Sequence, residues 1–225
     1  MTALTLKAYR AVLIIVAIMA ALLFVAAGTL DYWQAWIFLA VYFVASLAVT
    51  FDLAQRDPQL LERRMGGGPF AEKETTQKII MSLTSLGFIA LIVVPALDRR
   101  FAWSDVPPYL ALAGDLLVAL GFLAAYFVFR ENTFTSATIE LAPEQRVIST
   151  GPYALVRHPM YAGGIILLVG VPLALGSWWG LLVVAAMVPA LIWRLIDEEK
   201  FLARNLTGYP EYQRKVRYRL VPGVW

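Results

Sequence analysis

The stretch that decides the fold is YAGGIILLVGVPLALGSWWGLLVVAAMVPALIWRLI, residues 161–196. It holds two apolar runs, 161–176 and 178–196, with Ser177 between them and Arg194 as the single charged residue. Inside a lipid bilayer only helices and closed barrels satisfy every backbone polar group. The runs are continuous and do not alternate as barrel strands do, so they predict a tight hairpin of two membrane-spanning helices.

Four more apolar blocks precede this hairpin, at residues 11–30, 33–53, 79–97 and 108–129. Each is close to the roughly 20 residues that a helix needs to cross a bilayer. Of the 225 residues, 60% are hydrophobic and 16% are charged. A water-soluble domain of this length cannot bury so much apolar surface, and a disordered chain needs the opposite composition. The sequence therefore predicts an all-α, polytopic membrane helix bundle with about six transmembrane helices.

The basic residues indicate how these spans are oriented. Of the 19 Lys and Arg residues, only Arg99 and Arg100 fall on one side of the predicted spans. The others lie near the N-terminus, in the 54–78 loop, in the 130–159 segment and after the last apolar run. Because basic loops tend to stay in the cytoplasm, we expect both termini to be cytoplasmic. Topology and anionic lipid head groups then account for the net charge of +3, so we expect the bilayer as a partner and no nucleic acid.

The polar residues that can carry chemistry gather on this cytoplasmic side. Residues 151–164 read GPYALVRHPMYAGG and contain the single histidine, His158. Pro159 suits the first turn of a helix, whose free N–H groups attract an anion, and Tyr161 can share the face of His158. The chain has no Cys, which excludes disulfides and thiolate zinc sites, and we assign no metal-binding residue.

A second polar cluster lies at the end of the last apolar run and just beyond it, and includes Arg194, Glu198 and Glu199. The hairpin returns this cluster to the neighbourhood of residues 157–161. Either glutamate can hold an ammonium or a ribose hydroxyl, or simply end the helix in solvent. Arg194 lies one turn before Glu198, so it either pairs with that glutamate or clamps an anionic substrate. The oligomeric state is left open by the sequence.

The combined motifs resemble a known family, the integral-membrane methyltransferases typified by isoprenylcysteine carboxyl methyltransferase, to which phospholipid N-methyltransferases are related. The resemblance covers roughly residues 130–225. It rests on Gly151-Pro152-Tyr153, Arg157-His158-Pro159-x-Tyr161-x-Gly163, Glu198-Glu199 and Gly208-Tyr209-x-x-Tyr212.

This resemblance implies two regions: four N-terminal transmembrane helices in residues 1–130, with the cytoplasmic loop at 54–78, and a cofactor-binding region with the hairpin and polar tail in 131–225. It implies S-adenosylmethionine as the cofactor, bound on the cytoplasmic side. It also implies that Arg157 and Arg194 orient a substrate carboxylate and that Asn132 adds a substrate contact. The cofactor contacts would be Gln145, Val147, Ile148, Tyr153, His158, Pro159, Tyr161, Glu198 and Glu199.

The implied activity is methyl transfer to a lipophilic acceptor that enters laterally from the bilayer. A carboxylate of the isoprenylcysteine kind is the first expectation, because it is already ionised and needs no general base. A lipid amine is the second. One alternative is a membrane NADPH-dependent sterol or lipid reductase, since those enzymes share a similar His-Pro-x-Tyr stretch, although they tend to have Asn where this chain has Met160. Another is a non-catalytic multi-pass membrane protein, whose polar residues would be spread along the spans.

Overall fold

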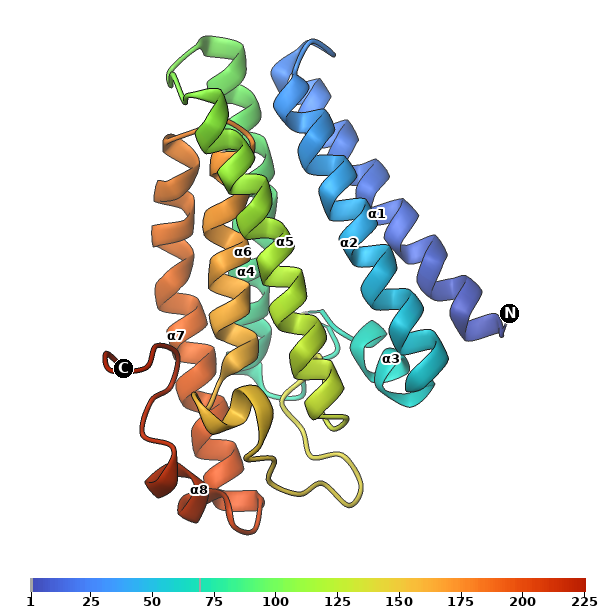
Figure 1. Ribbon diagram of the computed structural model, residues 1–225, viewed down its shortest axis with the longest axis vertical. Helices are drawn as coiled ribbons and strands as arrows, with labels where there is room; N and C mark the ends of the chain where they lie inside the picture. The colour runs from blue at the N-terminus through green and yellow to red at the C-terminus, as the bar shows by residue number, and fades with distance from the viewer. Residues whose placement is uncertain (1, 69) are drawn as a thin grey trace.

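The protein is built from helices packed side by side (Figure 1). A computed structural model describes residues 2–68 and 70–225, and within these residues there is no strand. The expected all-α fold is confirmed. In chain order the elements are α1 (Ala3–Ala27), α2 (Trp33–Arg56), α3 (Pro58–Met65), α4 (Thr75–Phe101), α5 (Pro108–Glu131), the 3₁₀ helix η1 (Gly151–Ala154), α6 (Pro159–Ala174), α7 (Trp179–Asn205) and α8 (Tyr209–Lys215).

Among the described residues, five helices, α1, α2, α4, α5 and α7, are long and apolar enough to cross a membrane. The remaining expected span forms α6, an apolar helix of only 16 residues. At 1.5 Å per residue α6 is about 24 Å long, which is less than the roughly 30 Å of a hydrocarbon core. A polytopic helical bundle is therefore confirmed, whereas six crossings stay a prediction.

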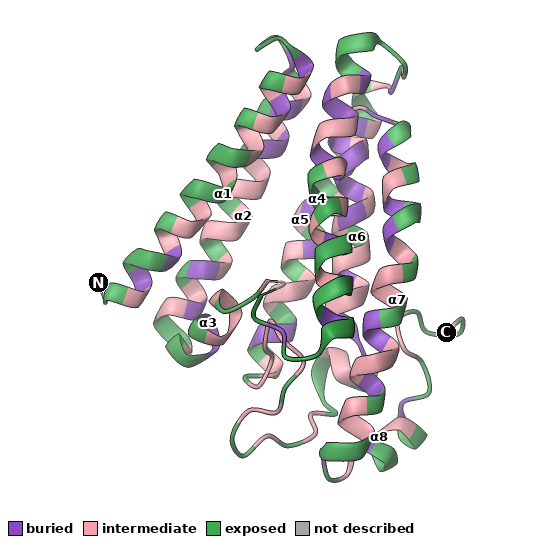
Figure 2. Cartoon of the chain, turned by 180° about the vertical axis from the view of Figure 1, so that it is seen from behind, coloured by how far each residue is buried: buried purple, intermediate pink, exposed green. Residues whose placement is uncertain are grey.

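Helices α4, α5, α6 and α7 stand together, and the α1–α2 pair leans away from them toward the end that holds α3 (Figure 1). Buried residues line the faces that the helices turn toward one another, while the outward faces are exposed (Figure 2). Large apolar side chains such as Leu13, Ile14 and Val25 of α1 are among the exposed ones. In a membrane protein such faces contact lipid, so their exposure agrees with the composition.

The closest helix contact joins α5 and α6, and it depends on glycine. A Cβ at Gly114 of α5 would lie 2.2 Å from the backbone nitrogen of Ala174, and one at Gly170 of α6 would lie 2.8 Å from the carbonyl oxygen of Gly114. Small residues let membrane helices approach backbone to backbone, where van der Waals contact drives association. This contact fixes α6, which begins at Pro159, against the longer helix α5.

The predicted hairpin is confirmed: α6 ends at Ala174 and α7 begins at Trp179. The Ser177 side chain between them is fully buried, and its hydroxyl donates to the carboxylate of Asp98 at the end of α4. Asp98 also accepts hydrogen bonds from the backbone nitrogen and the hydroxyl of Ser104, at 2.7 and 2.6 Å. One buried carboxylate thus ties the hairpin turn to the α4–α5 connection at the end opposite α3 and α8.

The predicted orientation can be tested because the chain has no cysteine of its own. Asp105 and Ser149 are both exposed, the first in the α4–α5 connection and the second before η1. With D105C and S149C made one at a time, an impermeant maleimide should label the two cysteines from opposite sides of sealed membrane vesicles, with Cys at position 149 reached from the cytoplasmic side. The cysteine-free protein is the control, and labelling of both variants from one side would contradict the orientation.

Candidate functional site

A cavity of about 770 Å³ opens where α6 and α7 meet the segment before η1. Its polar end contains every predicted site residue except Glu199. Its other end is an apolar limb that runs between helices, lined by Ile15, Met19 and Leu22 of α1, Met81 and Phe88 of α4, and Phe122 of α5. The sequence therefore predicted the polar end of the site, and the structure adds an apolar extension supplied by helices outside the motif region.

Arg157 holds the C-terminal tail, the residues from Val216 onward, by hydrogen bonds. Its Nε donates to Glu199 Oε1 at 2.6 Å, and its Nη1 donates to the carbonyl oxygens of Val216 and Arg217, both at 2.9 Å. The backbone nitrogens of Arg157 and His158 donate to the carbonyl oxygens of Tyr218 and Arg219, also at 2.9 Å. The tail residues that follow α8 are thereby held against the start of α6.

Glu198 and Glu199 have different surroundings, because consecutive residues of a helix point about 100° apart. Glu199 is only 5% exposed and also accepts a hydrogen bond from Arg219 Nε at 2.8 Å, so it lies among the cations that hold the tail. Glu198 lines the cavity, where its carboxylate accepts a hydrogen bond from the Tyr161 hydroxyl at 2.7 Å. Of the two glutamates, Glu198 is the one positioned to contact a ligand.

His158 stands at the start of α6 and is buried at the cavity wall. Its ring packs edge-on against Tyr161, with 5.7 Å between the ring centroids. Its Nε2 lies 3.2 Å from Glu199 Oε1 but is not aligned for a hydrogen bond, so this buried nitrogen has no partner among the described residues. This nitrogen faces Glu199, so the side of the ring that lines the cavity is the part of His158 that a ligand can contact.

Gly163 and Gly164 follow on α6 and serve different purposes. A Cβ at Gly163 would lie 2.7 Å from Ala124 of α5, so this glycine permits helix packing. A Cβ at Gly164 would meet nothing within 4 Å, and this glycine lines the cavity. The absence of a side chain at residue 164 therefore keeps the cavity open beside the first turns of α6.

Asn132 and Tyr153 form the wall beneath α5. Asn132 Nδ2 donates to the Tyr153 hydroxyl at 3.0 Å, and the Tyr212 hydroxyl of α8 donates to the Tyr153 carbonyl oxygen at 2.7 Å. Burial raises the pKa of Tyr153 to about 12, so its hydroxyl keeps its proton and can donate it to a ligand in the cavity. Asn132 is thus a cavity residue that also orients a neighbouring tyrosine.

Gln145, Val147, Ile148 and Pro159 complete the predicted cofactor contacts, and all of them line the cavity. Gln145 Oε1 accepts a hydrogen bond from the Ala142 backbone nitrogen at 2.9 Å, so its amide supports its own loop. Val147 packs with Tyr153 in the apolar cluster around Leu206, Tyr209 and Tyr212. The segment before η1 is therefore held by α8, which the sequence did not indicate.

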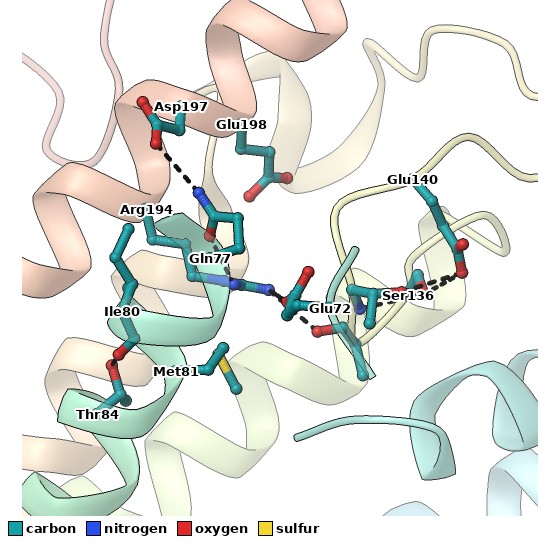
Figure 3. Close-up of polar contacts among 12 residues, drawn as sticks. Glu72, Gln77, Ile80, Met81, Thr84, Ser136, Glu140, Arg194, Asp197 and Glu198 are labelled. Atoms are coloured by element: carbon teal, nitrogen blue, oxygen red, sulfur yellow. Dashed lines mark hydrogen bonds and ion pairs between the residues drawn. The ribbon is translucent and has the colours of Figure 1, made fainter. Parts of the chain in front are cut away.

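Arg194 has a partner from the loop between α3 and α4 (Figure 3). Its Nη2 donates to Glu72 Oε1 at 2.7 Å and to the Ala137 carbonyl oxygen at 3.1 Å, and its Nη1 donates to Gln77 Oε1 at 2.9 Å. Gln77 Nε2 in turn donates to Asp197 at 3.1 Å. The expected pairing of Arg194 with Glu198 does not form, because Glu198 faces Tyr161 and Glu72 balances the arginine.

Sequence reasoning missed Arg64, Glu72 and Gln77, which come from the 54–78 loop. Glu72 is 4% exposed although it lies outside any helix, and Arg64, in the last turn of α3, lines the cavity. No motif or periodicity marks these positions. The one available signal was their location, because this loop was expected on the same membrane side as the polar motif.

Comparison with known proteins agrees with the motif-based resemblance. Residues 110–207 match the family described as phospholipid methyltransferase. The Delta(14)-sterol reductase TM7SF2 of Mus musculus is 28% identical over 137 residues, which are 53% of this chain and 33% of the reductase. The match spans about a third of that relative's length. The family match confirms the predicted resemblance and supports a multi-pass membrane methyltransferase.

The different surroundings of the two glutamates predict different effects on stability. Glu199→Gln removes the charge that balances Arg157 and Arg219, so we expect a loss of about 3 kcal/mol and an apparent Tm lower by roughly 5–10 °C. Glu198→Gln, its matched control, keeps the Tyr161 contact and should change Tm by less than about 2 °C. Thermal unfolding of both variants in detergent measures this difference, and equal losses would contradict the distinct roles.

Proposed function

We propose that the chain transfers a methyl group from S-adenosylmethionine to a lipophilic acceptor, because residues 110–207 match the phospholipid methyltransferase family. The observation that carries this proposal is the single cavity that joins a polar end on α6 and α7 to an apolar limb between α1 and α4. A water-soluble cofactor and a lipid need such a shared space, because the reacting atoms have to meet while each molecule keeps its own environment.

The polar end of the cavity has side chains that are suited to bind S-adenosylmethionine. The Glu198 carboxylate is suited to an ammonium or a ribose hydroxyl, and the His158 ring at the cavity wall is suited to pack against the ligand. Gly164 leaves space beside both residues, and Tyr153, Val147 and Ile148 close the opposite wall. When bound, S-adenosylmethionine supplies an electrophilic methyl group carried on a sulfonium.

The chain's own contribution to the reaction is to position two ligands and to exclude water. The apolar limb holds the acceptor's tail, which directs its head group toward the polar end of the cavity. A carboxylate head group is ionised near neutral pH, so an oxygen lone pair forms the new O–C bond as the C–S bond breaks, and no residue has to remove a proton. We therefore propose a carboxylate of the isoprenylcysteine kind as the first acceptor class.

A lipid amine is the second acceptor class. An ammonium head group has to lose a proton before its nitrogen can attack, and Glu198 is the carboxylate in the cavity that can accept it. Glu199 is not available for this step, because it is paired with Arg157 and Arg219. The cofactor would enter from the cytoplasmic side in both cases, and the acceptor from the bilayer.

A membrane reductase is the second candidate function, favoured by the 28% identity to the Delta(14)-sterol reductase TM7SF2. The same cavity can take a lipid in its apolar limb, and a nicotinamide cofactor would then occupy the polar end. The methyltransferase ranks first because the family match includes the residues that line this polar end, from Asn132 to Glu198.

Cofactor binding tests the proposal directly. Purified protein in detergent should bind S-adenosylhomocysteine in isothermal titration calorimetry. Glu198→Gln and His158→Ala should each weaken binding by about tenfold or more, because the first removes a charged hydrogen-bond acceptor and the second removes the imidazole from the cavity wall. Glu211→Gln, at an exposed residue of α8, is the matched control and should bind as the wild type does. Tight binding of NADPH without binding of the sulfur cofactor would replace the methyltransferase by the reductase.

A further inference from the structure

Two of the arginines that line the cavity have their charge balanced within the protein. Arg157 lies 2.6 Å from Glu199, and Arg194 lies 2.7 Å from Glu72. Both pairs are buried, with exposed fractions of 8% and 9% for the arginines. Figure 3 shows the Arg194 guanidinium directed toward Glu72 and Gln77. An anionic ligand that bound either arginine would compete with the glutamate already paired with it. This competition reduces the binding free energy that the contact can provide.

Arg64 also lines the cavity but is balanced differently. Its Nη1 donates to the Ser136 carbonyl oxygen at 2.6 Å, and its guanidinium lies over the ring of Phe129, 5.3 Å from the centroid. Among residues 2–68 and 70–225 it forms no ion pair within 4.0 Å, unlike Arg157 and Arg194. Arg146, the fourth arginine of the cavity lining, is also unpaired among these residues, but its side chain is exposed to solvent. Burial lowers the pKa of Arg64, and the nearby negative charge of Glu198 only opposes this effect. A desolvated guanidinium with donors left over is suited to bind an anion.

The position of Arg64 indicates which ligand carries that anion. Arg64 belongs to α3, whose Leu60 and Leu61 pack against Ala8 of α1 and Leu53 of α2. It therefore approaches the cavity from the side of α1, which also supplies Ile15 and Met19 to the apolar limb. His158 and Glu198 approach from α6 and α7. Glu198 also acts electrostatically on Arg64, so the guanidinium lies between the polar end and the apolar limb, where the head group of a lipid in the limb would lie.

We propose that Arg64 is the specificity-determining residue that recognises an anionic head group, carboxylate or phosphate, on the lipophilic acceptor. The inference rests on the proposed methyltransferase function and specifies its substrate: an amphiphile with its tail between α1 and α4 and its negative charge beneath α3. Arg157 and Arg194 then act as positioning residues, since their charges hold the tail and the α3–α4 loop in place. This assignment differs from the one implied by the motif resemblance, in which those two arginines orient the carboxylate.

Matched amphiphiles test this proposal. The probes are dodecanoate and dodecyl phosphate, with uncharged dodecanamide as the reference, and equilibrium binding is measured on the full chain in an uncharged detergent. Wild-type protein should prefer both anions to the amide by about tenfold or more, because a charge-assisted hydrogen bond is stronger than a neutral one. Arg64→Gln should abolish this preference, and Arg64→Lys should retain part of it. Arg63→Gln is the matched control, because Arg63 neighbours Arg64 on α3 but does not line this cavity.

Binding of S-adenosylhomocysteine is measured on the same variants and separates the possible outcomes. The proposal expects Arg64→Gln to bind it with unchanged affinity. If Arg64→Gln loses affinity for S-adenosylhomocysteine and keeps the preference for anionic amphiphiles, Arg64 holds the cofactor's carboxylate and the proposal is wrong. No preference in the wild type also overturns it. Failure of the wild type to bind S-adenosylhomocysteine would instead refute the methyltransferase function, and Arg64→Met, which keeps the packing over Phe129, replaces any Gln variant that does not fold.

Discussion

The buried ion pair between Arg157 and Glu199 is the interaction on which the site depends. It joins the segment before α6, the end of α7 and, through Val216 and Arg217, the C-terminal tail. A buried charge pair is stabilising only when its remaining donors and acceptors are satisfied. Here backbone carbonyls and Arg219 provide that satisfaction, so the tail cannot leave without exposing unpaired charges. The position of His158, one residue after Arg157, follows from this pairing.

Two adjacent glutamates can serve structure and ligand because a helix separates consecutive side chains by about 100°. Glu199 faces the tail, and Glu198 consequently faces the cavity with Tyr161. The sequence shows an acid pair just after the last apolar run, but α7 continues to Asn205, so neither acid lies in the last turn, where the helix dipole disfavours acids. The structure supplies the reason for the pair: one acid neutralises buried arginines, and the other remains as a polar group at the cavity wall.

The sequence was sufficient for those parts of the fold and site that depend on local patterns. Continuous apolar runs predict the long helices. The motif from Tyr153 to Tyr161 predicts much of the cavity's polar end, because its residues are close in sequence and all lie at or just before the start of α6. The roles of Arg64 and Glu72 could not be predicted from the sequence. Arg64 bonds to Ser136, and Glu72 bonds to Arg194, in each case across a long sequence separation. Ser136 and Glu72 lie in irregular backbone, which has no periodicity from which such contacts can be predicted. The sequence left two alternatives for Arg194, Glu198 or an anionic substrate, and the loop residue Glu72 was not among them.

The unequal lengths of α6 and α7 explain why the cavity has both polar and apolar walls. By the rise per residue, α6 with 16 residues is about 24 Å long and α7 with 27 residues is about 40 Å. Since a short turn joins their far ends, the start of α6 lies well short of the end of α7, between the apolar limb and the polar segments that follow α5 and α7. The residues at that start, His158 and Tyr161, therefore line a cavity that has both polar and apolar walls. A full-length α6 would carry these residues toward the end of α7 and separate them from the apolar limb.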